Sequence, residues 1–308
     1  MHRKTIVVTL AIVTLAAAAT TPGFAQTPTP AAGTARIAKA APLPDFSGIW
    51  WHPSLPGPEP LSSGPTVITN LSRRDGVANP DQLVGDYTNP ILKPGAAAIV
   101  KKFGEMSLAG TLYPNPANQC WPEPGPFIYK NFGLQLLQRP EDVTMLYEQD
   151  HEVRHVRMNQ RHPAHVTPSW YGDSVGHYEG DTLVIDTVGI KTDRPFAMLD
   201  LFGTPFTKAL HMIERYRLVS YEEAEDGLQR NAKENLPVNQ PLDRSYRGKY
   251  LQLTYTVFDE GVFTTPWTAT MTYGRGPKAW PEIACAENPH VYYRNQDERV
   301  PTASRPDF

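Results

Sequence analysis

The residues best suited to chemistry gather between Tyr147 and Thr187, which hold five of the nine histidines together with several carboxylates. The clearest local pattern there is a hairpin, in which the β-rich runs 174–179 and 182–188 are joined by a Gly-Asp turn. We therefore expect any reactive or binding centre to be built largely from this stretch.

The hairpin divides its side chains into two sets, because residues alternate between the two faces of a strand. The first set is Ser174, Gly176, Tyr178, Leu183, Ile185 and Thr187, and the second is Val175, His177, Glu179, Val184 and Asp186. Both sets mix apolar with polar residues, so the pattern does not say which face would line a barrel. His177 and Asp186 share a face and could form a His–Asp pair, with a solvent-side salt bridge as the alternative.

A second candidate is the run 209–217, where a strand would place His211 and Glu214 on opposite faces. The face of Glu214 is otherwise apolar, and a carboxylate there costs free energy unless it is paired or used. A desolvated carboxylate has a raised pKa, which suits a general acid or base. Glu214 is thus a candidate base, or else the partner of an arginine such as Arg154. His211 is the alternative base, or else an outward or hydrogen-bonded core histidine.

The remaining histidines do not predict a metal site. His151 and His155 are four residues apart, which on a strand is roughly 13 Å and too far for one ion. His162 and His165 flank Pro163 in a loop without an evident third ligand. We expect a polar surface loop, with a gating or substrate-contacting loop and a metal-binding loop as the alternatives.

Several signatures of common enzymes are missing from the sequence. It has no Walker A motif, no G-x-G-x-x-G fingerprint and no H-E-x-x-H. The G-x-S-x-G at 172–176 opens a hairpin instead of a strand-to-helix turn, so it is no nucleophile elbow. We therefore expect chemistry without an organic cofactor and without a metal.

The first residues predict export. A basic start, Met1–Lys4, precedes an apolar run, Thr5–Ala19, and small residues that suit cleavage after Ala25. This pattern is typical of a secretory signal peptide over 1–25, with an uncleaved anchor as the alternative. We expect a periplasmic or secreted protein with no membrane insertion after cleavage. The formal charge of −3, without a basic block, argues against a nucleic-acid partner.

Two cysteines, Cys120 and Cys285, occur in the chain. In an exported protein this number favours one disulfide. Two free buried thiols or a catalytic cysteine are the alternatives, and neither residue has metal-ligand spacing.

The rest of the chain predicts a mostly β protein. Residues 26–43 resemble a flexible linker, and 44–308 are expected to form a single domain. Residues 94–108 predict a surface helix, and 222–235 predict one more weakly. Eight to ten strands in sequence-adjacent hairpins favour an antiparallel up-and-down barrel of the lipocalin or calycin kind, with a two-sheet sandwich as the alternative.

Five motifs together resemble a family of exported bacterial β-rich proteins that carry sequences close to GxSxGxWEGDTLVVDT and ALHxxER. Here they are DFSGIW at 45–50, CWP at 120–122, RHP at 161–163, GDSVGHYEGDTLVIDT at 172–187 and ALHMIERY at 209–216. Tyr178 stands where the family has Trp, and Phe206 lies near a position that is often His. The matched positions are His162, Trp170, Ser174, Glu179, Asp181, Asp186, His211 and Glu214. The resemblance implies export and a β-rich core, and no particular reaction.

These observations favour a periplasmic enzyme, a lyase, isomerase or hydrolase, that uses acid–base chemistry on a small apolar or aromatic molecule. The expected catalytic residues are His211 or Glu214 as base, Asp186 as its orienting partner, and Arg154 or Tyr178 as stabiliser of negative charge. The expected substrate-binding residues are His162, Trp170, Tyr171, Ser174 and His177. A lipocalin-like carrier without catalysis is the alternative, and an envelope scaffold is a third hypothesis.

Overall fold

The structure is a computed structural model of the 308-residue chain. It describes residues 43–52, 58–71, 83–111, 113–130, 133–193, 197–234, 245–276 and 284–285. The predicted signal peptide over 1–25 and the predicted linker up to residue 42 lie outside the described residues. Those that are described belong to one compact unit, which begins at Ala41. Neither α-helix among them combines the length and the apolar character that crossing a membrane requires.

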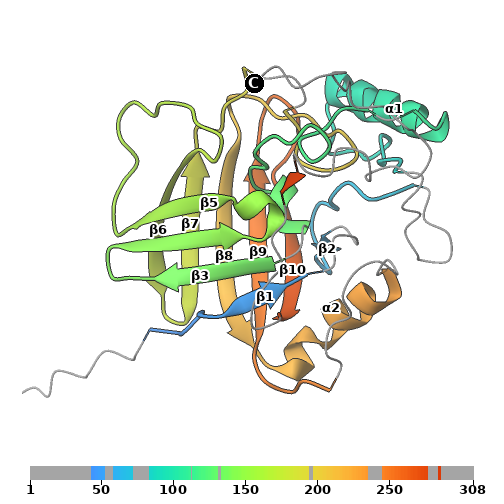
Figure 1. The fold of residues 1–308 in the computed structure, drawn as a ribbon. Helices are drawn as coiled ribbons and strands as arrows, with labels where there is room; N and C mark the ends of the chain where they lie inside the picture. The colour runs from blue at the N-terminus through green and yellow to red at the C-terminus, as the bar shows by residue number, and fades with distance from the viewer. Residues whose placement is uncertain are drawn as a thin grey trace, which may run out of the picture. The chain divides into compact units, whose positions relative to one another are not determined.

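The described residues form a closed β-barrel, as the sequence predicts (Figure 1). Its strands are β1 (Ile49–Trp51), β3 (Gly133–Gln138), β4 (Asp142–Tyr147), β5 (Val153–Met158), β6 (Asp173–Glu179), β7 (Thr182–Val188), β8 (His211–Val219), β9 (Tyr250–Phe258) and β10 (Trp267–Arg275). Neighbours in this series pair with each other, and β1 closes the ring by pairing with both β3 and β10. A two-residue strand, β2 (Glu59–Pro60), pairs with β10 outside this ring.

One pairing departs from the predicted antiparallel pattern. Strands β5 and β6 run parallel, with Arg157 opposite Val175, whereas every other pairing in the described barrel is antiparallel. Parallel neighbours cannot be joined by a tight turn and need a connection of a dozen or more residues. The connection is the segment 159–172, which contains His162 and His165. The parallel pairing therefore fixes where this histidine-bearing loop begins and ends.

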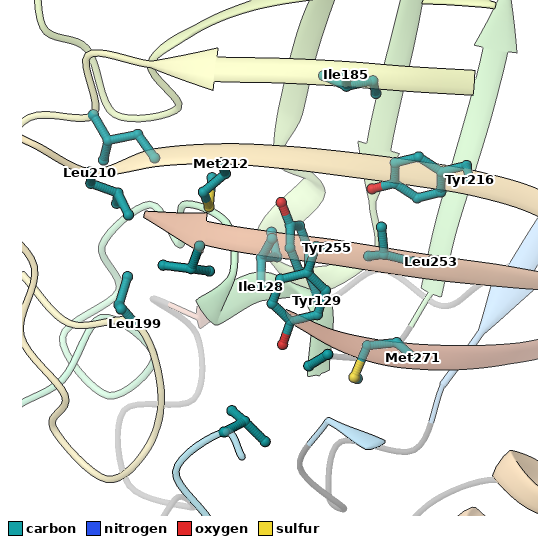
Figure 2. Packing of buried hydrophobic residues seen from close by; sticks show 14 of the residues in the cluster. Ile128, Tyr129, Ile185, Leu199, Leu210, Met212, Tyr216, Leu253, Tyr255 and Met271 are labelled. Carbon is teal, nitrogen blue, oxygen red and sulfur yellow. The ribbon is translucent and has the colours of Figure 1, made fainter. Parts of the chain in front are cut away.

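Side chains from all parts of the barrel pack together in its interior. Strands β7 and β8 contribute Ile185 and Met212 to this cluster, because alternate residues face inward. A 3₁₀ turn, η1 (Phe127–Lys130), adds Tyr129, whose ring lies edge-on to that of Tyr255 with centroids 5.1 Å apart. Figure 2 shows Tyr129 among these strand residues. The interior, where a lipocalin-like barrel would hold its ligand, is thus occupied by the chain's own side chains.

Two α-helices accompany the described barrel. Helix α1 (Pro94–Leu108) has the predicted bounds, with Pro94 at a position that suits its fixed φ. The buried residues of α1 are Ala96, Val100 and Gly104, which are four residues apart and so lie on one side of the helix. Helix α2 (Tyr221–Glu234) contacts β9 and β10, and Ala224 packs with Val219 and Tyr250 in a second cluster.

Glu59 of β2 is covered by α2. A Cβ atom added to Gly227 would lie 2.7 Å from its Oε1, and the hydroxyl of Thr272 donates to its Oε2 at 3.1 Å. Burial raises the pKa of Glu59 from 4.5 to about 7, against the smaller opposing effects of Thr272 and Arg230. The pKa of Glu59 is higher in the folded protein than in the unfolded chain. The contribution of the protonated Glu59 carboxyl to stability is therefore fully present below about pH 4.5, and it is lost as the pH rises through about 7.

We expect Glu59→Gln to stabilise the protein at about pH 8 by about 2 kcal/mol, because the amide needs no proton to remain neutral. Urea unfolding at a series of pH values measures the difference, which should shrink toward zero near about pH 4.5. Glu141→Gln, in the exposed β3–β4 turn, is the matched control and should show no such trend. A pH-independent effect of Glu59→Gln would contradict this account.

Candidate functional site

Five polar side chains form a continuous row on the outside of the barrel, here called the His–Asp cluster. Its members, in order of contact, are Arg157, Asp173, His162, Asp186 and His211. Nη2 of Arg157 donates to both carboxylate oxygens of Asp173, at 2.6 and 2.8 Å. Asp173 also contacts Nδ1 of His162 at 3.0 Å. Oδ1 of Asp186 lies 3.1 Å from Nε2 of His162 and 2.9 Å from Nε2 of His211.

The strand registers bring these residues to one end of the barrel. Asp173 opens β6 and pairs with Val188 at the end of β7, and Val188 pairs with His211 at the start of β8. Asp186 lies two residues before Val188 and so projects from the same face. His162 comes from the β5–β6 connection and inserts between the two aspartates. Sequence neighbours on β7 and β8, such as Thr187 and Met212, point into the core instead.

Both aspartates of the cluster are held in the ionised form. Partial burial would by itself raise the pKa of Asp186, but its hydrogen bonds with His211 and His162 bring it below the ordinary value. The pKa of Asp173 is lowered in the same way. Burial alone would raise it, but the contacts with His162 and Arg157 lower it by more. Carboxylates that stay charged can accept hydrogen bonds and cannot donate them.

His211 is the most accessible imidazole of the cluster. Its side chain is 36% exposed, and its ring stacks on that of Phe258 with centroids 5.2 Å apart and planes at 24°. The stack follows from the register, which places Phe258 of β9 directly opposite His211. Nε2 of His211 is engaged by Asp186, while Nδ1 forms no hydrogen bond with any described residue. One nitrogen is therefore oriented by a carboxylate and the other is left for a further partner.

Glu214 and Arg154 form a separate, fully buried network inside the barrel. Nη1 of Arg154 donates to Oε1 of Glu214 at 2.9 Å, and its Nη2 donates to Oε2. The guanidinium also donates to Ser174 at 3.0 Å and to Thr187 at 2.6 Å, and Tyr216 donates to Glu214 at 2.8 Å. Burial alone would lower the pKa of Arg154, but the charge of Glu214 holds it well above its ordinary value. This is the structural ion pair that the sequence allowed as the alternative to catalysis by Glu214.

The other expected site residues lie outside both groups. The hydroxyl of Tyr178 accepts a hydrogen bond from Nε2 of Gln138 at 2.8 Å. His177 is exposed and contacts Glu179 at 3.0 Å, so the conceivable His177–Asp186 pair is not formed. The register explains this, because His177 is opposite Val184 and not opposite Asp186.

Trp170 and Tyr171, the two aromatic residues expected to line the pocket, have partners outside the His–Asp cluster. Trp170 is near Trp121, with ring centroids 6.5 Å apart, and Nζ of Lys191 lies 5.4 Å from its ring centroid. Burial and the neighbouring Glu152 carboxylate raise the pKa of Tyr171, which keeps its phenol protonated. These partners, Trp121, Lys191 and Glu152, do not belong to the His–Asp cluster.

The acid–base groups that the sequence singles out lie on two sides of the barrel wall. Arg154 and Glu214 are buried inside it, whereas His211 and Asp186 lie on the outer face. The cause is the strand period of two: the odd spacing between His211 and Glu214 places them on opposite sides of β8.

Sequence reasoning missed three participants: Arg157, Asp173 and Phe258. Asp173 has a sequence signal, since it lies one residue before the predicted strand that starts at Ser174. Arg157 reaches Asp173 because β5 and β6 are parallel neighbours. Phe258 reaches His211 through the β8–β9 register, which no local pattern fixes.

The predicted disulfide is present, and Cys120 and Cys285 are joined. Among the described residues, no group of three or more His, Cys, Asp or Glu side chains has an arrangement that could hold a metal ion. The chain was compared with protein-family models, with curated proteins and with solved structures, and none of them matches it.

Proposed function

We propose that this protein is an exported acid–base enzyme in which His211 exchanges a proton with substrate through its Nδ1 atom. The observation that carries the proposal is the geometry of His211: Nε2 lies 2.9 Å from an ionised Asp186, and Nδ1 has no hydrogen bond within the described chain. A carboxylate in this position orients the imidazole and stabilises the imidazolium that forms when the ring takes up a proton.

The steps follow from this geometry. Because Asp186 can only accept, Nε2 of His211 carries the proton and Nδ1 presents its lone pair. Nδ1 removes a proton from the substrate, or from a water that attacks it, and the resulting positive charge is shared with Asp186. The same proton then returns to a leaving group or to another substrate atom. This sequence serves a lyase, an isomerase or a hydrolase, and we assign the enzyme to this broad class.

The expected substrate remains a small apolar or aromatic molecule. Phe258, stacked on His211, offers a flat apolar surface beside the proposed base. No Ser, Thr or Cys side chain forms a hydrogen bond with His211 or His162 in the described part of the chain, which favours direct proton transfer over a covalent intermediate. Arg154 and Tyr178 have no part in this proposal, since their polar groups are engaged elsewhere.

Export is part of the proposal. It is supported by the basic and apolar pattern of the first 25 residues and by the Cys120–Cys285 disulfide, a bond that persists in oxidising compartments. The carrier alternative is not favoured by any observation, because the barrel interior holds packed side chains and the Arg154–Glu214 network.

The test is a panel of aryl esters, β-hydroxy aryl ketones and aryl ketones in deuterated water, which report hydrolysis, loss of water and proton exchange. We expect turnover of at least one compound, and we expect His211→Ala to lower kcat by about a hundredfold or more. Asp186→Asn should lower kcat in the same direction, because the amide no longer favours the tautomer that exposes Nδ1.

His155→Ala is the matched control, since His155 is an exposed histidine on the neighbouring strand β5 and outside the cluster. Its turnover should equal that of the wild type. Failure of the whole panel, or turnover in His211→Ala equal to that of the control, would argue against the proposal.

A further inference from the structure

His162 makes two contacts that a neutral imidazole cannot make together as hydrogen bonds. Its Nδ1 lies 3.0 Å from Asp173, and its Nε2 lies 3.1 Å from Asp186. A neutral ring donates through one nitrogen and accepts through the other, whereas the cation donates through both. Both partners are ionised carboxylates, which only accept.

From this geometry we infer that His162 is held as an imidazolium between Asp173 and Asp186, and that it is the positioning residue for His211. The catalytic meaning of this inference rests on the proposed function, but the charge state of His162 does not. Asp186 receives one hydrogen bond from each histidine on the same oxygen, Oδ1. Its position is therefore fixed from two sides, and so is the direction from which it holds His211.

The charges that face His162 are consistent with this state. They are Asp173 of β6, Asp186 of β7 and the guanidinium of Arg157 of β5 behind Asp173, while the imidazole of His211 of β8 lies behind Asp186 as a donor through Nε2. Each carboxylate of the row therefore lies between two donors. A neutral His162 would leave one carboxylate oxygen facing a lone pair at about 3 Å, which is unfavourable.

The loop that carries His162 is fixed at both ends, so the imidazole is presented in a defined place. The backbone N–H of Asn159 donates to Gly176 of β6 at 2.7 Å. At the other end Ser169 forms a bridge with Ile190, beyond the end of β7. The contacts with Asp173 and Asp186 then restrict the rotamers of the His162 side chain.

The experiment is imidazole nitrogen NMR on the ¹⁵N-labelled full chain near pH 7.5, with assignments from single histidine variants. We expect both nitrogens of His162 to be protonated and His211 to carry its proton on Nε2 alone. In Asp173→Asn, which removes one acceptor charge, we expect His162 to become neutral. A neutral His162 in the wild type would overturn the inference.

The second arm is His162→Gln, whose single amide can reach only one aspartate. We expect a mixture of His211 tautomers and a drop of about tenfold in kcat with little change in KM, since orientation is lost and not binding. His165→Gln, in the same loop and exposed, is the matched control and should change neither.

The two failures are distinguishable. If His162 is cationic but His211→Ala retains full turnover, the charge state inferred for His162 is supported and the proposed function is contradicted. If His211→Ala is inactive but His162→Gln keeps the wild-type tautomer and kcat, the proposed function stands and His162 is not a positioning residue.

Discussion

Replacing Arg154 with methionine is expected to destabilise the protein by about 3–5 kcal/mol, because it leaves the Glu214 carboxylate buried without its cation. Arg154 and Glu214 are 3% and 0% exposed, so water does not replace the lost partner. The same change removes the guanidinium N–H groups that donate to the hydroxyls of Ser174 and Thr187. These two hydroxyls retain the hydrogen bond of 3.0 Å to each other. Urea unfolding near pH 7 measures the loss.

A double-mutant cycle separates the pair from its surroundings. Arg154→Met with Glu214→Leu removes both charges, and we expect the double variant to be more stable than Arg154→Met alone, since a buried pair replaced by apolar groups is often neutral. The exposed pair of Arg215 and Glu179, 2.7 Å apart, is the control, and Arg215→Met should have little effect. Equal stability of Arg154→Met and wild type would contradict the account of the network.

Loss of the Cys120–Cys285 disulfide is the other large expected effect. The bond joins residues 165 apart in sequence, and in the loop-entropy model a closed loop of this length contributes about 5 kcal/mol. We expect reduction, or replacement of both cysteines by serine, to lower the free energy of unfolding by a large part of this value. Urea unfolding with and without reductant measures it.

The control for this experiment is the double serine variant itself, which has no thiols and should not respond to reductant. A reductant-dependent change in that variant would show that the effect comes from elsewhere in the chain. Wild-type stability that is unchanged on full reduction would contradict the prediction.

Local patterns were sufficient to predict most of the strands. The bounds 182–188 follow from a run of β-formers that starts after a Gly-Asp turn, and the structure has them unchanged. The hairpin register across Gly180 was also predictable, because a two-residue turn fixes it. The barrel followed from these hairpins, since closure removes unpaired edges.

What local patterns could not supply was the pairing of distant segments. The parallel β5–β6 contact depends on the path of the connecting loop, and nothing in the two strands distinguishes it from an antiparallel one. The site depends on this contact, because it brings Arg157 to Asp173 and anchors the loop of His162. The sequence suggested Asp186 as the orienting partner of a base such as His211. The position of His162 between two carboxylates could be seen only in the structure.

The barrel is closed by its shortest member, since β1 has three residues and holds β3 on one side and β10 on the other. Trp50 is opposite Leu134 of β3 and Arg275 of β10, so the three residues of β1 join the two strands that would otherwise be the edges of an open sheet. A chain shortened to begin after Trp51 would expose two long strand edges at once, and unpaired edges recruit strands from other molecules. Because one short strand closes the barrel, removal of the N-terminal residues up to Trp51 should promote self-association.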